Sequence, residues 1–300
     1  MSRAKLGIIG GSGLYDLPGL GAWKELAITS PWGEPSDRLR LGRIGQTEVV
    51  FLPRHGRGHT VSPSEINYRA NIDGFKRAGV TDLVSFSAVG SYKKELPPGT
   101  FVIVDQIIDR TFRRETSFFG NGCVAHVPFA QPVGPRLAAR MGEALKTENL
   151  PHVSTGTAIC MEGPQFSTAA ESRSYKAQGF DVIGMTSMPE AKLAREAEIT
   201  YCMVAMVTDF DAWHCDHDSV DVAMIMRQMQ INTRSAQKAI LRLAADFPAE
   251  RELCPAGSHR ALDGAIVTPP QYRNPALLKK LDAIAGRVLN APATPSKGQP

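Results

Sequence analysis

Short apolar runs recur along the chain, each bounded by glycine or by polar residues. Runs of this length without strict alternation are typical of strands that are buried on both faces of a sheet. They predict β-strands at residues 6–9, 49–52, 83–86, 101–104, 153–161, 182–185 and 201–207. Between these runs the apolar positions recur with the helical period, so strands and helices alternate along the chain.

Helix boundaries follow from proline at the first turn and from glycine after the last turn. Helices are expected at residues 63–77, 135–146, 168–178, 189–198 and 220–244. This alternation predicts an α/β fold in which a mixed central β-sheet is flanked by α-helices. No break in composition suggests a linker, so we expect a single domain over residues 1–289. Residues 290–300, rich in proline and alanine, are expected to form a flexible tail.

Composition excludes several classes of protein. Hydrophobic residues make up 43% and charged residues 21% of the 300-residue chain, which is the balance of a globular protein. The formal net charge of +4 is spread along the sequence, so we expect no nucleic-acid partner and favour a small anionic substrate. The five cysteines are dispersed and form no C-x-x-C pair. No apolar stretch approaches the roughly 18 residues of a membrane span, so we expect a cytoplasmic protein with reduced thiols and no membrane partner.

Polar groups follow four of the predicted strands, at the edge of an α/β sheet where ligands bind. The first strand runs into a Gly-Gly-Ser-Gly turn at 10–13, whose backbone N–H groups allow close approach of an anion. Its spacing fits neither the dinucleotide fingerprint nor the P-loop. Arg54 and His55 follow the second strand, and Ser87 and Thr186 follow two later ones. Each is equally well a structural turn or a solvated loop, but together they favour an oxyanion site that Arg54 grips bidentately.

Two further segments carry residues suited to binding a base. Asp209 and Asp211 are two apart on an extended segment, so both side chains are expected to face one side. Such a pair suits general-acid chemistry or base recognition, and a helix N-cap is the structural alternative. Phe166, in a Gly-Pro turn, is able to stack on a planar base, although a core phenylalanine is the commoner role. The His-Cys-Asp-His-Asp run at 214–218 has no second ligand group at recognisable spacing, so no metal is expected.

These segments, in order over residues 5–245, resemble the purine nucleoside phosphorylase family, in particular its methylthioadenosine phosphorylase branch. The matching motifs are GIIGGSGL at 7–14, RHGRGHT at 54–60, NYRANI at 67–72, DRT at 109–111, EGPQFS at 162–167, MTSMPE at 185–190 and TDFDAW at 208–213. Several motifs of this length in register are highly specific. The resemblance implies a nucleoside phosphorylase fold, a pentosyltransferase activity and a homotrimer. It implies no cofactor, since inorganic phosphate is a co-substrate.

The resemblance also assigns roles to individual residues. The implied phosphate ligands are Ser12, Arg54, His55, Ser87, the backbone of Ala88, and Thr186. Serine stands at 12 and 87 where the family often has threonine, and the hydroxyl donor is retained. The residues implied on the nucleoside side are Phe166, Ser167, Met185, Asp209, Phe210, Asp211 and Val222. The resemblance further implies that His126 reaches the pocket of a neighbouring subunit.

The implied reaction is the reversible phosphorolysis of S-methyl-5'-thioadenosine to adenine and 5-methylthioribose 1-phosphate, in purine and methionine salvage. It passes through a ribosyl cation, and the departing purine gains a proton at N7. Asp209, with its pKa raised by a dry pocket, is the expected catalytic acid. Carboxylates accept hydrogen bonds from a 6-amino group, so Asp209 and Asp211 favour an aminopurine. Two alternatives stay open. One is a broader purine nucleoside or methylthioinosine phosphorylase, and the other is a non-catalytic nucleotide- or metal-binding protein.

Overall fold

The computed structural model describes residues 3–17, 19–213 and 222–290. At its centre is a mixed sheet, for which eleven strands are described. Its middle is formed by β1 (Leu6–Gly10), β4 (Thr47–Pro53), β5 (Asp82–Ser91) and β11 (Thr200–Phe210). β1 pairs in parallel with β4 and β5, and β11 pairs in parallel with β5. The expected α/β class with a mixed central sheet is confirmed.

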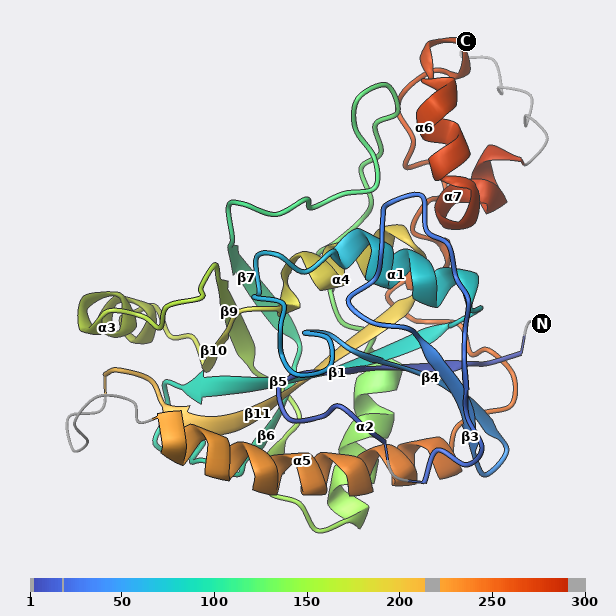
Figure 1. Cartoon of the computed structure of the whole chain (residues 1–300). Coiled ribbons are helices and arrows are strands. Elements are labelled where there is room, and N and C mark those ends of the chain that lie inside the picture. The colour runs from blue at the N-terminus through green and yellow to red at the C-terminus, as the bar shows by residue number, and fades with distance from the viewer. Residues whose placement is uncertain (1–2, 18, 214–221, 291–300) are drawn as a thin grey trace.

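Helices cover both faces of this sheet (Figure 1). On one face lie α1 (Tyr68–Arg77) and α4 (Ser187–Glu196), and on the other lie α2 (Pro135–Thr147) and α5 (Val222–Ala245). All five residues of β1 are buried, as are the first nine of β11, because both strands have a helix layer on each side. This double coverage explains why the strands appear in the sequence as continuous apolar runs.

The remaining strands extend the sheet towards its edges. They are β2 (Lys24–Glu25), β3 (Arg40–Ile44), β6 (Phe101–Val104), β7 (Gln106–Arg110), β8 (His152–Val153), β9 (Thr157–Met161) and β10 (Val182–Gly184). The single strand predicted at 153–161 is wrong. It divides into β8, which pairs with β6, and β9, which pairs with β7 and β10. Between the two, the Gly156 amide bonds to the Asp105 carboxylate at 2.9 Å instead of joining a ladder.

The first residue of a helix depends on side-chain caps, and the hydrophobic period and proline positions do not always locate these caps. α1 begins at Tyr68 and not at Pro63, because the Asn67 side chain accepts a hydrogen bond from the Ala70 amide and caps the helix there. α3 (Ala169–Ala177) begins where Thr168 and Glu171 form a capping box. The 63–66 stretch forms a turn instead, and the Tyr68 hydroxyl donates to the Pro63 carbonyl at 2.9 Å.

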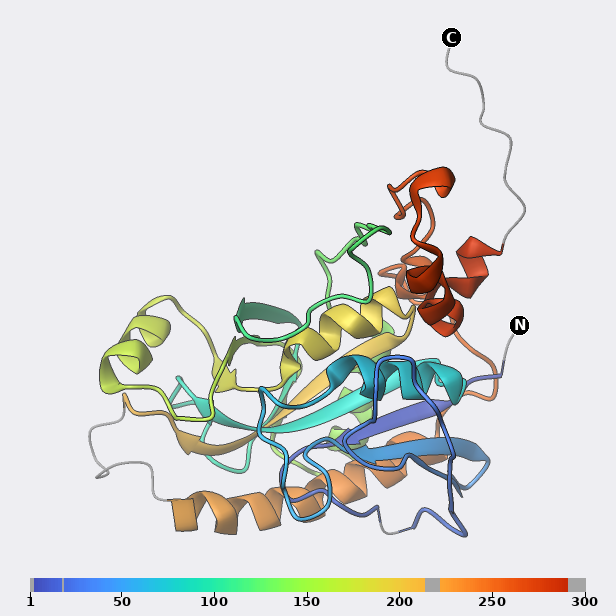
Figure 2. The ribbon, with the colours of Figure 1, turned by 45° about the horizontal axis from the view of Figure 1, so that its top comes forward.

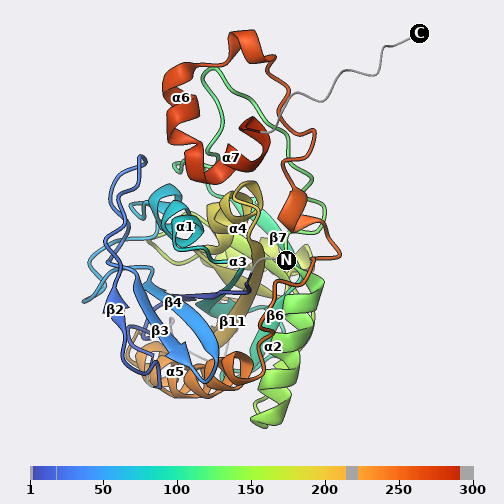
Figure 3. The same ribbon diagram turned by 90° about the vertical axis from the view of Figure 1, so that its right-hand side faces the viewer.

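A long excursion over residues 111–131 leaves the sheet after β7 and runs beside the C-terminal segment (Figure 1 and Figure 2). The C-terminal segment contains short turns at Ser258–Arg260 and Pro270–Tyr272, then α6 (Pro275–Lys280) and α7 (Asp282–Leu289). Figure 3 shows α6 and α7 stacked beyond α1. The predicted tail lies outside the described residues, apart from position 290. Among the described residues, no helix has the length and apolar character to span a membrane.

Candidate active site

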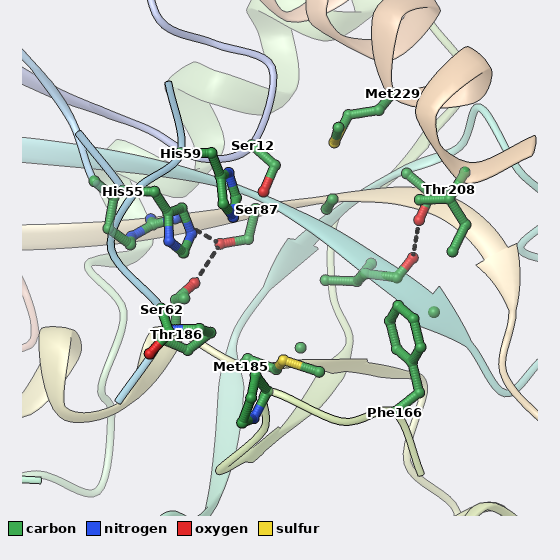
Figure 4. Close-up of a pocket in the computed structure, with 18 of the residues that line it drawn as sticks. Ser12, His55, His59, Ser62, Ser87, Phe166, Met185, Thr186, Thr208 and Met229 are labelled. Carbon is green, nitrogen blue, oxygen red and sulfur yellow. Dashed lines mark hydrogen bonds between the residues drawn. The ribbon is translucent and has the colours of Figure 1, made fainter. Parts of the chain in front are cut away.

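A cavity of about 580 Å³ opens where β1, β4, β5 and β11 end. These strands run parallel, so the residues that follow them meet at one edge of the sheet. The turn after β10 and the first turns of α5 complete the wall. Figure 4 shows Ser12, His55, His59, Ser87 and Thr186 gathered towards one end and Phe166, Thr208 and Met229 towards the other. The volume is within the range of small-molecule pockets.

Arg54 is the buried cation at the end of the cavity where Ser87 and Thr186 lie, and only 1% of its side chain is exposed. Its Nε–H donates to the Glu190 carboxylate at 2.8 Å, and Nη2 donates to the second oxygen at 3.3 Å. Tyr201 donates to the same carboxylate at 2.8 Å. Nε and Nη2 are therefore paired with an internal carboxylate, as a guanidinium this deeply buried requires, and the predicted contact with an oxyanion is left to the other amino group. Burial lowers the pKa of Arg54, but Glu190 more than offsets this, so the guanidinium stays charged.

The other amino group of Arg54, Nη1, donates to the Phe86 carbonyl at 3.2 Å and faces a group of hydroxyls. Nη1 donates to the Ser87 hydroxyl at 3.3 Å, and Ser87 in turn lies 3.0 Å from the Thr186 hydroxyl. Gly11 brings the loop with Ser12 against this group, since a Cβ at Gly11 would lie 2.4 Å from the Phe86 carbonyl oxygen. Three hydroxyls and one cation, each from a different segment, thus surround one end of the cavity. This arrangement suits a tetrahedral oxyanion.

His55 is held neutral in this corner. Burial and the charge of Arg54 lower the pKa of His55 to about 3. Its Nδ1 lies 2.9 Å from the Val61 carbonyl, so Nδ1 carries the proton and Nε2 is an acceptor. His59 stacks on it with ring centroids 4.2 Å apart, and Tyr15 lies 3.0 Å from His59 Nδ1. Sequence reasoning missed the pocket positions of His59 and Tyr15, although His59 stands in the matched motif.

Asp209 and Asp211 both line the opposite part of the cavity, as their spacing predicts. Burial raises the pKa of Asp209 to about 6; the Thr208 hydroxyl, which donates to it at 2.7 Å, opposes the rise, and the Asp211 charge adds to it. Burial also raises the pKa of Asp211. Gly90 makes room for both, since a Cβ there would lie 3.3 Å from the Asp209 carboxylate and from Asp211 Cβ.

The nucleoside-side residues of the prediction fall into three groups. Met185 and Phe166 line the cavity, and Phe166 is 54% exposed. Ser167 and Phe210 lie beside it without lining it: the Ser167 hydroxyl contacts Met161 sulfur at 3.6 Å, and the Phe210 ring packs on Trp213. The Val222 side chain lies outside the described part of the chain, as does the cluster at 214–218. The apolar wall that α5 contributes was missed, and it consists of Ile225, Met226 and Met229.

His126 does not line the cavity of its own chain. It is exposed on the 111–131 excursion, where its amide donates to the Ala265 carbonyl at 2.9 Å. Ala88 lines the cavity, as expected from its place in β5. In the described ranges, no three His, Cys, Asp or Glu side chains come together as a metal site.

An oxyanion corner and a buried acid share one pocket of a mixed α/β sheet. This arrangement suits an enzyme that transfers a group from a base to an anion. The family model of the phosphorylase superfamily matches residues 5–245. The S-methyl-5'-thioadenosine phosphorylase of Bradyrhizobium diazoefficiens is 63% identical over 96% of this chain and 99% of its own. That of Rhodospirillum rubrum is 56% identical over 95% of this chain and 97% of its own.

Solved structures agree with these relatives. A methylthioadenosine phosphorylase from an antarctic soil metagenomic library superposes with a TM-score of 0.87 at 43% identity, over 95% of this chain and 99% of that one. A mutant adenosine/methylthioadenosine phosphorylase from Schistosoma mansoni in complex with methylthioadenosine gives 0.79 at 34% identity, over 90% of this chain and 99% of that one. The chain belongs to the S-methyl-5'-thioadenosine phosphorylase family of the phosphorylase superfamily. The predicted family is thereby confirmed, and the roles of single residues stay predictions.

Proposed function

We propose that this protein catalyses the reversible phosphorolysis of S-methyl-5'-thioadenosine, giving adenine and 5-methylthioribose 1-phosphate. The observation that carries the proposal is the meeting of two unlike groups in one cavity. Arg54 with its hydroxyl neighbours lies towards one end, and Asp209, whose pKa is raised to about 6, lines the other part. The relatives named above support the choice of substrate.

On the phosphate side, we assign the anion to Ser12, Arg54, His55, Ser87, the Ala88 amide and Thr186. The Nη1 group of Arg54 and the hydroxyls donate to phosphate oxygens, while the Glu190 pair keeps the guanidinium in place. His55 Nε2 has no proton and accepts the hydrogen of a monohydrogen phosphate. Held in this way, a phosphate oxygen attacks the anomeric carbon within one complex, which removes much of the entropic barrier.

On the purine side, the bond between the anomeric carbon and N9 breaks, and its electron pair passes into the purine ring. Protonated Asp209 donates its proton to N7, so adenine leaves as a neutral molecule. Seating a purine removes more water from the Asp209 carboxyl group and favours the protonated form further. Asp211 accepts from the 6-amino group, and Phe166, Ser167, Met185 and Phe210 border the base and the ribose.

We place the 5'-methylthio group against the apolar wall of Ile225, Met226 and Met229, with Val222 at the start of the same helix. Transfer of a thioether from water to such a wall costs little free energy, whereas a 5'-hydroxyl needs a hydrogen-bond partner there. His126 is assigned to the pocket of an adjacent subunit in a homotrimer. Its exposure away from its own cavity supports this assignment.

We further assign the enzyme to the cytoplasm, with inorganic phosphate as co-substrate and no cofactor. The four cysteines in the described part of the chain are buried free thiols, which fits a reducing compartment.

The test is adenine release from methylthioadenosine by the purified protein, followed by chromatography with and without phosphate. We expect adenine and 5-methylthioribose 1-phosphate in equal amounts, and only with phosphate. Adenosine and methylthioinosine in the same assay separate this activity from a broader phosphorylase. Adenine formed equally well without phosphate, or no adenine under any condition, would overturn the proposal.

A further inference from the structure

Arg114 is nearly fully buried beside the cavity, with 1% of its side chain exposed, but it does not line it. Its Nε donates to the Glu162 carboxylate at 3.1 Å. Its two amino groups donate to four backbone carbonyls, namely those of Met185 and Met188 at 2.6 Å, Glu162 at 2.7 Å and Met161 at 3.4 Å. Only arginine offers this many donors in one rigid plane.

The carbonyls that Arg114 binds belong to the two turns that carry the nucleoside side of the pocket. Glu162 stands at the start of the turn that contains Phe166. Met185 lines the cavity, and Thr186, which follows it directly, is the one assigned phosphate ligand on these turns. In the described structure, Arg114 has no hydrogen bond to β1, β4 or β5, which carry most of the phosphate side. Among its side-chain hydrogen bonds in the described structure, only the donation to the Tyr68 hydroxyl of α1, at 3.2 Å, leaves these two turns. Arg114 therefore acts mainly on the nucleoside half of the site.

Glu162, the carboxylate that pairs with Arg114, is itself held by hydrogen bonds from two other segments. Its carboxylate accepts from the Ser64 hydroxyl and from the Phe112 amide, the latter at 2.7 Å. Burial would raise the pKa of Glu162, but these hydrogen bonds and Arg114 outweigh it and hold the pKa at about 2. Glu162 is consequently a carboxylate at every working pH. Together with Arg114 it connects the start of the 111–131 excursion to both turns.

We propose that Arg114 is a positioning residue for the nucleoside: by binding both turns it sets the distance between the Met185 and Phe166 walls and the phosphate corner. This inference rests on the proposed phosphorolysis. The guanidinium itself touches neither substrate. A displacement of about 1 Å in either turn would separate the anomeric carbon from the attacking oxygen, and such errors cost about 100-fold in rate.

The test compares Arg114→Lys with the wild type in steady-state kinetics, varying methylthioadenosine and phosphate separately. Lysine keeps the charge opposite Glu162 but is a point charge that reaches fewer carbonyls. We expect the KM for methylthioadenosine to rise about tenfold or more and kcat to fall, while the KM for phosphate changes less than about threefold. Arg113→Ala, an exposed side chain on the same segment, is the matched control and should behave as the wild type.

Glu162→Gln separates the two contributions of the pair. It removes the charge but leaves Arg114 its carbonyl partners, so we expect a smaller rise in the nucleoside KM than in Arg114→Lys. If Arg114→Lys does not fold, the double variant Arg114→Gln with Glu162→Gln leaves no unpaired buried charge and tests the same kinetic split.

Equal rises in both KM values, or unchanged kinetics in a folded Arg114 variant, would overturn the inference and leave the proposed function intact. The wild type is assayed alongside, and a wild type that releases no adenine with phosphate would instead contradict the proposed function.

Discussion

Asp209 depends on its surroundings for its proposed chemistry. Its carboxyl group stands beside Asp211 in a dry part of the cavity, and burial raises its pKa to about 6. An ordinary aspartate would hold almost no proton at neutral pH, whereas this one keeps a usable protonated fraction. The neighbouring Thr208 hydroxyl limits the rise, so the group remains able to give up its proton.

Replacing Asp209 with asparagine should lower turnover of methylthioadenosine by about 100-fold or more, because the general acid is lost. The amide donates where the carboxylate accepted, so preference should shift towards a 6-oxopurine nucleoside. The measurement is the ratio of kcat/KM for methylthioadenosine to that for methylthioinosine. A ratio equal to that of the wild type would contradict the role of Asp209.

Asp209→Asn should lower turnover but raise the free energy of unfolding. The folded-state pKa of about 6 lies above the ordinary value of 3.8, so the folded protein binds the proton more tightly than the unfolded chain. The contribution of Asp209 to the free energy of unfolding is therefore lost as pH rises through the window from 4 to 6. Asp209→Asn should be more stable than the wild type by about 1–3 kcal/mol at pH 7, with little difference near pH 4. Urea unfolding of both proteins at pH 7 and pH 4 gives the difference in their free energies of unfolding. A gain in stability that is no larger at pH 7 than at pH 4 would contradict this expectation.

Arg54→Ala should mainly impair the use of phosphate, with a loss of about 2–4 kcal/mol in transition-state stabilisation. It also leaves Glu190 buried without its cation, so the single variant should unfold more easily. The double variant Arg54→Ala with Glu190→Gln separates the two effects. We expect it to recover thermal stability while kcat/KM for phosphate stays low. Recovery of both would mean that Arg54 acts only on the fold.

At the scale of elements, parallel strands and the helix α5 form the two sides of the site. The strand ends supply polar groups, and α5 supplies Ile225, Met226 and Met229. Because helix side chains at spacings of three and four share a face, these three form one apolar stripe. The division gives the cavity a polar end, where we place phosphate, and an apolar wall, where we place the thioether. Within this wall Met229 is buried and Met226 is 48% exposed.

Met229→Gln should therefore change the preference at the 5' position. Glutamine is close in size to methionine but brings a hydrogen-bond donor and acceptor to the dry wall. We expect the kcat/KM ratio of methylthioadenosine to adenosine to fall about tenfold, mainly through the KM of methylthioadenosine. Competition between the two nucleosides in one reaction measures the ratio directly. Met224→Gln, exposed on the same helix, is the control and should leave it unchanged.

At the scale of the whole molecule, the C-terminal segment supports the excursion that carries His126. The Val267 amide donates to the Val124 carbonyl at 2.9 Å, and the Val124 amide donates to the Thr268 hydroxyl at 2.8 Å. The superfamily model matches residues 5–245, and this support comes from residues after that match. It holds His126 in an exposed position, which is where the proposed contact with an adjacent subunit requires it.

His126→Ala should raise the KM for methylthioadenosine by about three- to tenfold, with little change in the KM for phosphate. Dilution of the wild type should lower specific activity as subunits separate. Light scattering at the assay concentration gives the subunit number for comparison. A fully active monomer would contradict the shared pocket, although the phosphorolysis would stand.

Local pattern was sufficient for much of the fold because buried strands and capped helices depend on nearby residues. β1, β4, β5, β6 and β11 contain the runs predicted for them, and α2 begins at Pro135 as expected. β3 and β7 were missed because they lie towards the edges of the sheet, where some of their residues are exposed to solvent. Their polar residues hide the apolar signal.

Residue order was enough to predict the family, the buried strands β1, β4, β5, β6 and β11, the helices α1 to α5, and the polar groups at the strand ends. Motifs and periodicity are local properties. The partners of those groups come only from the tertiary structure. Glu190, far from Arg54 in sequence, pairs with two of the three guanidinium nitrogens. The pKa of Asp209 and the tautomer of His55 likewise depend on burial and on neighbours from other segments. Charges and hydrogen bonds act through space, so residue order alone leaves these properties undetermined.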